Sequence, residues 1–295
     1  MERDFTERIS AQIIQSSPIG KISAFLDRLL SRSLGAPAMR PLKIFLNGTW
    51  IGHPLHPMLT DIPIGAWTLT ILLDLIGLLF GFPQLGLASS ITACIGVAGA
   101  LAAAAAGLAD WMDVDPPEKA VGAFHAIVNV SATILFLISF LIRWGRHWQL
   151  GWAIFIVALA GYLLAMIGGY LGGALVFYKG VMINRNAYRS GPDDFRPAMA
   201  MSELAEGQLK RVVVEEQPVL LLKSGGTVYA LGAVCSHYGA PLNEGTIVDG
   251  TIECPWHASR FALEDGRVVQ GPACAGMPVY DCKIANDQVQ IKLRG

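Results

Sequence analysis

The chain of 295 residues is long enough for two domains, and its charged fraction of 15% lies well below the roughly 25% of a typical soluble domain. Its formal net charge of -1 gives no electrostatic footprint for nucleic acid, so we exclude that class of partner. Five cysteines are an odd number at low density, which argues against a disulfide scaffold and favours metal binding.

Residues 1–49 form an N-terminal segment that does not resemble a signal peptide, because acidic residues lie among its bases and it has no short apolar core. Within it, residues 17–35 read SPIGKISAFLDRLLSRSLG and open with a Ser-Pro helix start. The apolar residues of this stretch share one face, which predicts an amphipathic helix at the membrane interface. The alternative is a helix packed on the soluble part of the chain.

Residues 50–185 contain four apolar stretches, each long enough to cross about 30 Å of hydrocarbon at about 1.5 Å per residue. A soluble four-helix core would need polar outer faces, which these stretches lack. We therefore predict an α-helical transmembrane four-helix bundle that contacts the lipid bilayer. Its spans are residues 57–82, 85–109, 121–142 and 150–178.

Basic residues predict the orientation of the bundle. Those before the first span, between spans two and three, and after span four all fall on one side, whereas the opposite loops hold only Arg143 and Arg146. We expect a multi-pass protein of the bacterial cytoplasmic (inner) membrane with both termini in the cytoplasm. The Arg143 and Arg146 pair is a mild objection to this orientation.

The pattern changes after the fourth span. Residues 186–198 form a polar linker with glycine and proline, and residues 199–295 contain short runs rich in β-branched residues, punctuated by turn sequences such as SGG, VDG and EDG. These features predict a small all-β domain at the C-terminal end.

Two short motifs in this all-β domain carry potential metal ligands. Cys235 and His237 form a C-x-H pair in CSHYGA, and Cys254 and His257 form a C-x-x-H pair in CPWHASRF. Two thiolates and two imidazoles could hold a zinc ion, but this is also the ligand order of a Rieske [2Fe-2S] centre. The spacing alone leaves both interpretations open.

The surrounding residues 199–295 resemble the Rieske family, through the CPWH box, the aromatic Phe261 and the Gly-Pro-Ala turn that contains Pro272. This resemblance implies a small all-β Rieske-type iron-sulfur domain that binds a [2Fe-2S] cluster. It also implies two second-shell residues, Ser259, which would hydrogen-bond to a bridging sulfide, and Pro272 in a loop over the cluster. The implied ligands are Cys235 and Cys254 on the inner iron, and His237 and His257 on the outer iron.

The sequence departs from the quinol-oxidising Rieske subtype at three positions. Ala240 and Trp256 stand where that subtype has two disulfide-forming cysteines, and Phe261 replaces a tyrosine that would donate a hydrogen bond to the cluster. We therefore expect a midpoint potential in the lower part of the roughly -150 to +300 mV Rieske range. The chain is not a complete Rieske oxygenase, since the 38 residues after His257 contain no histidine for a second iron site.

The bundle contains its own candidate ligands. His53 and His56 precede the first span in GHPLHP, and His125 lies early in the third span, which is diagonal to the first in an up-down-up-down bundle. One interpretation is a b-type haem held by His125 with His56 or His53. A second is a non-haem metal or proton-relay site that adds Asp61 and Asp110. A third is that His56-Pro57 only starts a helix.

Residues 50–185 also resemble a bacterial family of four-span membrane proteins, through HPLHP, the histidine in span three and the ending GGALVFYKGVMIN. A histidine frequent in that ending is Lys179 here. From the whole sequence we expect a membrane-anchored Rieske protein that transfers single electrons between a soluble donor or acceptor protein and a membrane acceptor, which could be quinone, haem b or a partner protein. The alternative is a membrane-tethered redox sensor or assembly scaffold without turnover.

Overall fold

The computed structural model describes residues 5–188 and 191–295. The chain divides into two compact units. The first unit comprises Met1–Leu46 and Leu55–Val181, and the second comprises Asn47–Pro54 and Met182–Gly295. The second unit is therefore discontinuous in sequence, because a short segment ahead of the first long helix belongs to it.

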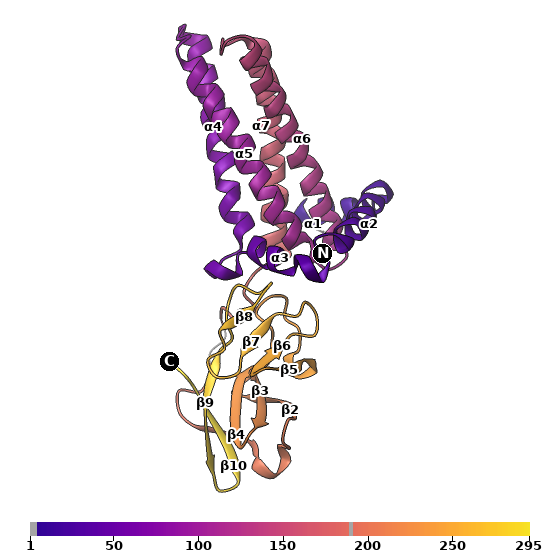
Figure 1. Ribbon diagram of the computed structural model, residues 1–295, viewed down its shortest axis with the longest axis vertical. Coiled ribbons are helices and arrows are strands. Elements are labelled where there is room, and N and C mark those ends of the chain that lie inside the picture. Colours follow the sequence, from indigo (N-terminus) through magenta and orange to yellow (C-terminus); the bar gives the residue numbers. More distant parts are fainter. Residues whose placement is uncertain (1–4, 189–190) are drawn as a thin grey trace. The chain divides into compact units, whose positions relative to one another are not determined.

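The first unit is built from helices, four of which are long and apolar enough to cross a membrane. These four helices confirm the predicted spans, and they lie side by side in Figure 1 as hairpins α4–α5 and α6–α7, with α4 and α6 on a diagonal. The helices are α1 (Phe5–Gln15), α2 (Ser17–Arg32), η1 (Pro37–Met39), α3 (Arg40–Asn47), α4 (Leu55–Phe80), α5 (Leu85–Met112), α6 (Glu118–Gly145), α7 (Trp152–Gly173) and the π-helical turn η3 (Ala174–Tyr178).

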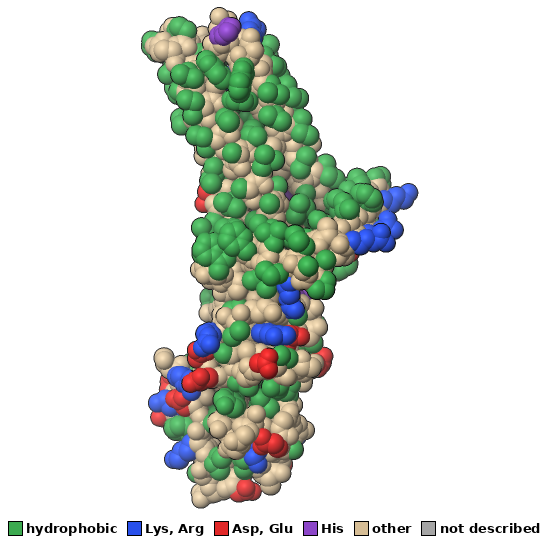
Figure 2. Space-filling model, in the orientation of Figure 1, with side chains coloured by type: hydrophobic (Ala, Val, Ile, Leu, Met, Phe, Trp, Pro, Cys, Tyr) green, Lys and Arg blue, Asp and Glu red, His purple; other side chains and the backbone are tan. Residues whose placement is uncertain are grey.

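The outer surface of the bundle is apolar, and its interior is lined mainly by small residues. Figure 2 shows hydrophobic side chains over most of the visible face of the long helices, whereas acidic and basic side chains lie on the β unit and basic ones on the protruding helix α2. Helix α5 buries Ala93, Gly96, Gly99, Ala103 and Ala106. Small buried residues allow helix backbones to approach closely, which is how helices pack where lipid replaces water.

Helix α2 has the amphipathic character predicted for residues 17–35. Ile22, Phe25 and Leu29 leave their apolar side chains exposed. On its polar side, Asp27 forms an ion pair with Lys119 of α6, with 2.5 Å between Oδ1 and Nζ. An exposed apolar face on a helix that is anchored beside a membrane bundle supports the prediction of an interfacial helix.

A buried ion pair between α4 and α6 accounts for two charged residues inside the bundle. Asp74 and Arg143 are each about 1% exposed, and Arg143 Nη1 donates to Asp74 Oδ1 at 2.8 Å and to Ser89 Oγ at 3.0 Å. Arg143 is therefore a residue of the bundle interior and was wrongly counted as a loop charge in the sequence. Only Arg146 remains as a basic residue between α6 and α7, which weakens the objection to the predicted orientation.

The second unit is an all-β fold made of two antiparallel sheets. One sheet has the strand order β1-β10-β9-β4-β3-β2, and the other has the order β5-β6-β7-β8. The strands are β1 (Arg196–Ala200), β2 (Leu209–Val214), β3 (Gln217–Ser224), β4 (Thr227–Gly232), β5 (Thr246–Val248), β6 (Thr251–Glu253), β7 (Arg260–Ala262), β8 (Val268–Gln270), β9 (Val279–Ala285) and β10 (Gln288–Leu293). Short helical turns η2 (Thr49–Ile51), η4 (Met201–Glu203) and η5 (Leu242–Glu244) complete the unit.

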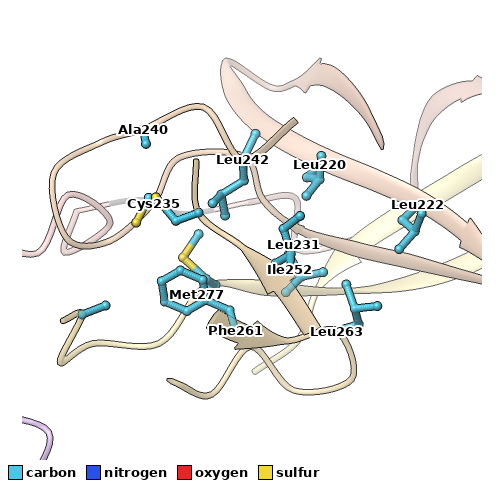
Figure 3. Close-up of a cluster of buried hydrophobic side chains, with 13 residues drawn as sticks. Leu220, Leu222, Leu231, Cys235, Ala240, Leu242, Ile252, Phe261, Leu263 and Met277 are labelled. Carbon is cyan, nitrogen blue, oxygen red and sulfur yellow. The ribbon is translucent and has the colours of Figure 1, made fainter. Parts of the chain in front are cut away.

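A hydrophobic cluster between the sheets supports the loops that carry the cysteines. Leu220 and Leu231 on the large sheet and Ile252 and Phe261 on the small sheet are fully buried in it, and Cys235 lies among them (Figure 3). Strand β3 is buried on both faces, because Leu220 and Leu222 point into this cluster while Val219 and Leu221 belong to a second cluster on the other face of the sheet. The predicted fold class, a transmembrane four-helix bundle plus a small all-β domain, is confirmed.

We predict that Asp74→Ala or Arg143→Ala alone lowers the free energy of unfolding by about 3–5 kcal/mol, because each leaves an uncompensated buried charge. The free energy is measured by SDS titration in mixed micelles. The double variant Asp74→Leu/Arg143→Met is expected to be more stable than either single variant, and the exposed Arg146→Ala serves as the matched control. Single variants as stable as Arg146→Ala would contradict this prediction.

Candidate metal centre

Two loops of the β unit share one backbone pattern, and each begins at a cysteine. The Cys235 amide donates to the carbonyl of Ala240 at 2.9 Å, and its carbonyl accepts from the Gly239 amide at 3.0 Å. In the other loop the Cys254 amide donates to the Ser259 carbonyl at 2.8 Å, and its carbonyl accepts from the amide four residues later at 3.1 Å. The two loops are thus equivalent in hydrogen bonding.

The fourth residue after each cysteine has a left-handed backbone, with φ of +86° at Gly239 and +55° at Ala258. Glycine adopts this conformation without strain, and the alanine is held there by the loop. In both loops the cysteine sulfur accepts hydrogen bonds from the amides two and three residues later, His237 and Tyr238 in one loop and Trp256 and His257 in the other. Each sulfur therefore sits in a nest of amides that favours a negative charge.

The loops bring the four predicted ligand residues together as two pairs. Cys235 and Cys254 are buried and lie within hydrogen-bond distance of each other. The rings of His237 and His257 have centroids 5.1 Å apart and planes at 89°. Thiols are thus paired with thiols, and imidazoles with imidazoles.

The two thiols affect each other's ionisation. The hydrogen bond from Cys235, assisted by the two loop amides, lowers the pKa of Cys254 from 9.0 to about 6. The same hydrogen bond, with burial, raises the pKa of Cys235 above its ordinary value. The hydrogen bond between the two sulfurs therefore favours ionisation of one of them to a thiolate, the form that binds metal.

A third loop, residues 271–275, is tied to both cysteine loops by serine hydroxyls. Ser259 is fully buried, and its Oγ accepts from the Ala273 amide at 3.0 Å, which leaves the hydroxyl proton for another acceptor. Ser236 instead donates its hydroxyl proton to the Ala275 carbonyl at 2.6 Å. Pro272 lies in this third loop, so the structure brings both predicted second-shell residues to the site.

Sequence reasoning missed a segment that covers this loop. Thr49 Oγ1 donates to the Ala273 carbonyl at 3.3 Å, and Cys274 Sγ lies 3.4 Å from the carbonyl oxygen of Asn47. A Cβ on Gly271 would clash with the side chain of Thr49, so only glycine permits this packing. The Asn-Gly dipeptide in NGTWIGHP indicates a turn, but nothing in the sequence assigns that turn to the β unit.

The two imidazoles differ in exposure. His237 is 5% exposed and faces a cavity of about 140 Å³, whose other lining residues include Gly52, Pro54, Met182 and Asn184. His257 is half-buried and follows Trp256, whose indole is exposed. Of the two, His257 is the more accessible from solvent.

The remaining departures noted in the sequence have simple structural roles. Ala240 is buried in the core cluster, and the fully buried Phe261 fills the same cluster without a hydroxyl group. Cys274 and Cys282 form no disulfide, and the sulfur of Cys282 contacts the carbonyl of Tyr280. Burial, with Asp281 adding to it, raises the pKa of Cys282 to about 11, so this thiol stays protonated near neutral pH.

In the helical unit, the structure brings together two of the three candidate histidines. The rings of His56 and His125 have centroids 6.1 Å apart. His53 lies in the segment that belongs to the β unit; it is exposed, and its Nδ1 donates to the carbonyl of Pro54 at 2.8 Å. Asp61 is exposed and Asp110 is buried.

The donor set fits a binuclear cluster better than a zinc ion. A structural zinc site gathers four ligands around one point. Among residues 5–188 and 191–295, no group of three or more His, Cys, Asp or Glu side chains is placed to hold one metal ion. A Rieske cluster needs only a cysteine pair for one iron and a histidine pair for the other.

Comparison with known proteins agrees with this chemistry. Residues 194–281 match the family model of the Rieske [2Fe-2S] domain, and residues 52–185 match that of a predicted membrane protein (DUF2231). The chain therefore belongs to the Rieske [2Fe-2S] family through its C-terminal part, and it carries this predicted membrane domain in the same polypeptide.

Relatives include the ferredoxin component of the naphthalene 1,2-dioxygenase system of Pseudomonas putida, which is 33% identical over 96 residues, or 32% of this chain and 92% of the relative. Apoptosis-inducing factor 3 of Mus musculus is 35% identical over 92 residues, or 31% of this chain, which spans only 15% of that relative's length. A solved structure, the ferredoxin of carbazole 1,9a-dioxygenase from Nocardioides aromaticivorans IC177, is 24% identical, with a TM-score of 0.33 over 34% of this chain and 98% of its own.

Proposed function

We propose that this protein is a membrane-anchored Rieske electron carrier that passes single electrons between a soluble protein and an acceptor in the membrane. Cys235 and Cys254 would hold one iron of the cluster as thiolates, and His237 and His257 would hold the other iron through their imidazoles. A [2Fe-2S] cluster bound there would supply one-electron redox chemistry. The buried nest of amides around each sulfur stabilises the thiolates.

The observation that carries this proposal is the convergence of two equivalent loops, each with one cysteine and one histidine, in a chain that also has four helices of membrane-spanning length. The ferredoxin relatives support the electron-carrier role. Since His257 and Trp256 are the more accessible part of the site, a soluble partner would dock on that side. The membrane acceptor would be quinone, haem or a partner protein.

The proposed location is the bacterial cytoplasmic membrane, with both termini in the cytoplasm. Arg143 is buried in the bundle in an ion pair with Asp74, so it is not a loop residue. The basic residues that remain in the loops therefore favour this orientation more strongly than the sequence suggested. A cluster without a supporting disulfide also suits a reducing compartment.

We predict that Cys254→Ser and His257→Ala abolish the Rieske visible and EPR signals of the full-length protein, because each removes an iron ligand. Cys282→Ser is the matched control, since this free thiol lies on strand β9, and it should keep the full signal. In liposomes, the reduced wild-type protein should be reoxidised anaerobically by a membrane quinone or by acceptors in bacterial membranes, and the Cys254→Ser protein should transfer no electrons. Failure of every membrane acceptor to reoxidise the cluster would favour the redox-sensor alternative.

We further predict that Ser259→Ala lowers the midpoint potential by on the order of 100 mV, since a hydrogen bond to a charged group contributes about 1.5–3 kcal/mol and 59 mV is a tenfold change for one electron. The expected wild-type value lies in the lower part of the Rieske range. Ser236→Ala is the control, because its hydroxyl proton is already donated to the Ala275 carbonyl. Redox titration followed by EPR decides; equal shifts in both variants would mean that Ser259 acts only on loop geometry.

Protease added to inverted membrane vesicles should degrade the C-terminal β unit, and protease added to intact spheroplasts should leave it untouched. Immunoblotting against a C-terminal tag gives the readout, and a periplasmic marker protein with the opposite pattern serves as the control. Digestion in spheroplasts alone would place the β unit outside the cytoplasm and overturn the proposed orientation.

A further inference from the structure

His56 and His125 form a symmetric pair inside the bundle. His56 Nδ1 donates to the carbonyl of Ala103 on α5 at 2.8 Å, and His125 Nδ1 donates to the carbonyl of Gly168 on α7 at 2.9 Å. A carbonyl can only accept, so both rings carry their proton on Nδ1. In a neutral imidazole this leaves the Nε2 lone pair for a ligand, the arrangement in which metal-binding histidines are usually held.

The pair belongs to an internal repeat of the two helix hairpins. Three pairs of side chains join α4 to α6, and in each pair the residue on α6 is 69 positions after the residue on α4. The three contacts therefore follow one another in the same order along both helices. The spacings of eleven and seven residues correspond to about three and two helical turns, which keeps each set on one face. The pairs are His56 with His125, Trp67 with Phe136, stacked at 4.2 Å, and Asp74 with Arg143.

The second helices of the two hairpins, α5 and α7, are related in the same way, but their equivalent residues differ by 65 positions in sequence. The carbonyls that accept from the histidines belong to Ala103 and Gly168, and a Cβ added to Gly107 or Gly172 would approach the ring of His56 at 2.8 Å or of His125 at 3.1 Å. Equivalent glycines therefore make room for equivalent rings. The two histidines occupy the same place in each repeat and meet on the pseudo-twofold axis between the hairpins.

We propose that His56 and His125 are the axial ligands of a b-type haem in this bundle. The chain offers two imidazoles here, and no third His, Cys, Asp or Glu joins them among the described residues. An ordinary metal ion needs more ligands than these two, whereas haem iron brings four nitrogens in its own macrocycle. A haem therefore requires from the protein only what the structure provides.

The dimensions and surroundings agree with this assignment. Imidazole nitrogens bind metals at about 2 Å, so rings on opposite sides of one iron have centres roughly 6 Å apart, as the 6.1 Å separation shows here. His56 lies on α4 of one hairpin and His125 on α6 of the other, so a group held by both rings would lie between the two hairpins. Asn129 Nδ2 lies 3.4 Å from His125 Nε2 but donates its shorter bond, 2.8 Å, to the His125 carbonyl.

Other candidates do not join the pair. Lys179 lies 3.5 Å from Glu118 in an ion pair, so it does not approach the histidines as a ligand. His53 belongs to the other unit, and Asp61 is exposed. The haem proposal uses residues of the first unit alone and does not depend on the proposed electron-carrier function.

The test is expression of the full-length protein with added haem precursor, followed by purification in detergent and pyridine-haemochrome analysis. The wild type should show a Soret band and a low-spin haem. His56→Ala and His125→Ala should each reduce haem content at least about tenfold, and millimolar imidazole should restore low-spin haem in both. His125→Met keeps a potential ligand and should retain haem with a raised midpoint potential.

The matched controls are His53→Ala and His147→Ala, which change exposed histidines and should retain haem fully. The [2Fe-2S] EPR signal reports folding of each variant, and Cys254→Ser should lose that signal but keep its haem, so the two proposals fail separately. A wild-type protein without haem, full haem in both alanine variants, or a different metal that disappears with either histidine would each overturn the assignment.

Discussion

Polar groups inside α4–α7 must find their partners within the bundle, because lipid supplies none. The chain meets this constraint by concentrating its strongest polar residues on one axis between two equivalent hairpins. The Asp74 and Arg143 charges neutralise each other there, and the histidine rings are fixed by backbone carbonyls. The glycines of α5 and α7 follow from the same constraint, since large side chains on the axis require small residues opposite them.

The β unit also contains a duplicated arrangement, in its case the two loops that carry the cysteines and histidines. A cluster that shares its ligands between two irons needs two thiols and two imidazoles in matching positions. The loops at Cys235 and Cys254 provide them by repeating one hydrogen-bonding pattern, and the buried core beneath keeps the loops in register. The two loops differ where it matters for tuning, because only one of the serines, Ser259, keeps a hydroxyl proton that is not used by a backbone carbonyl.

Much of this could be predicted from local sequence. Four long apolar stretches predict four spans, and the C-x-H and C-x-x-H motifs lie close enough in sequence to indicate one site. Relations between distant residues could not be predicted. The two hairpins have the same residue type at only one of these three equivalent positions, His56 and His125. The other two positions hold different residue types that pack or pair with each other, Trp67 with Phe136 and Asp74 with Arg143, so the repeat is not visible as sequence identity. Arg143 looked like a loop charge because its partner lies 69 residues away.

The short segment Asn47–Pro54 carries a consequence for how the protein is made. It belongs to the β unit, yet the ribosome synthesises it before the four long helices, and the rest of that unit follows them. Domains generally fold as their sequences emerge, and the contacts of this segment with residues 271–275 can form only after both pieces exist. The helical hairpins are therefore an insertion within the β unit, and a simple end-to-end joining of a membrane domain to a ferredoxin does not describe the architecture.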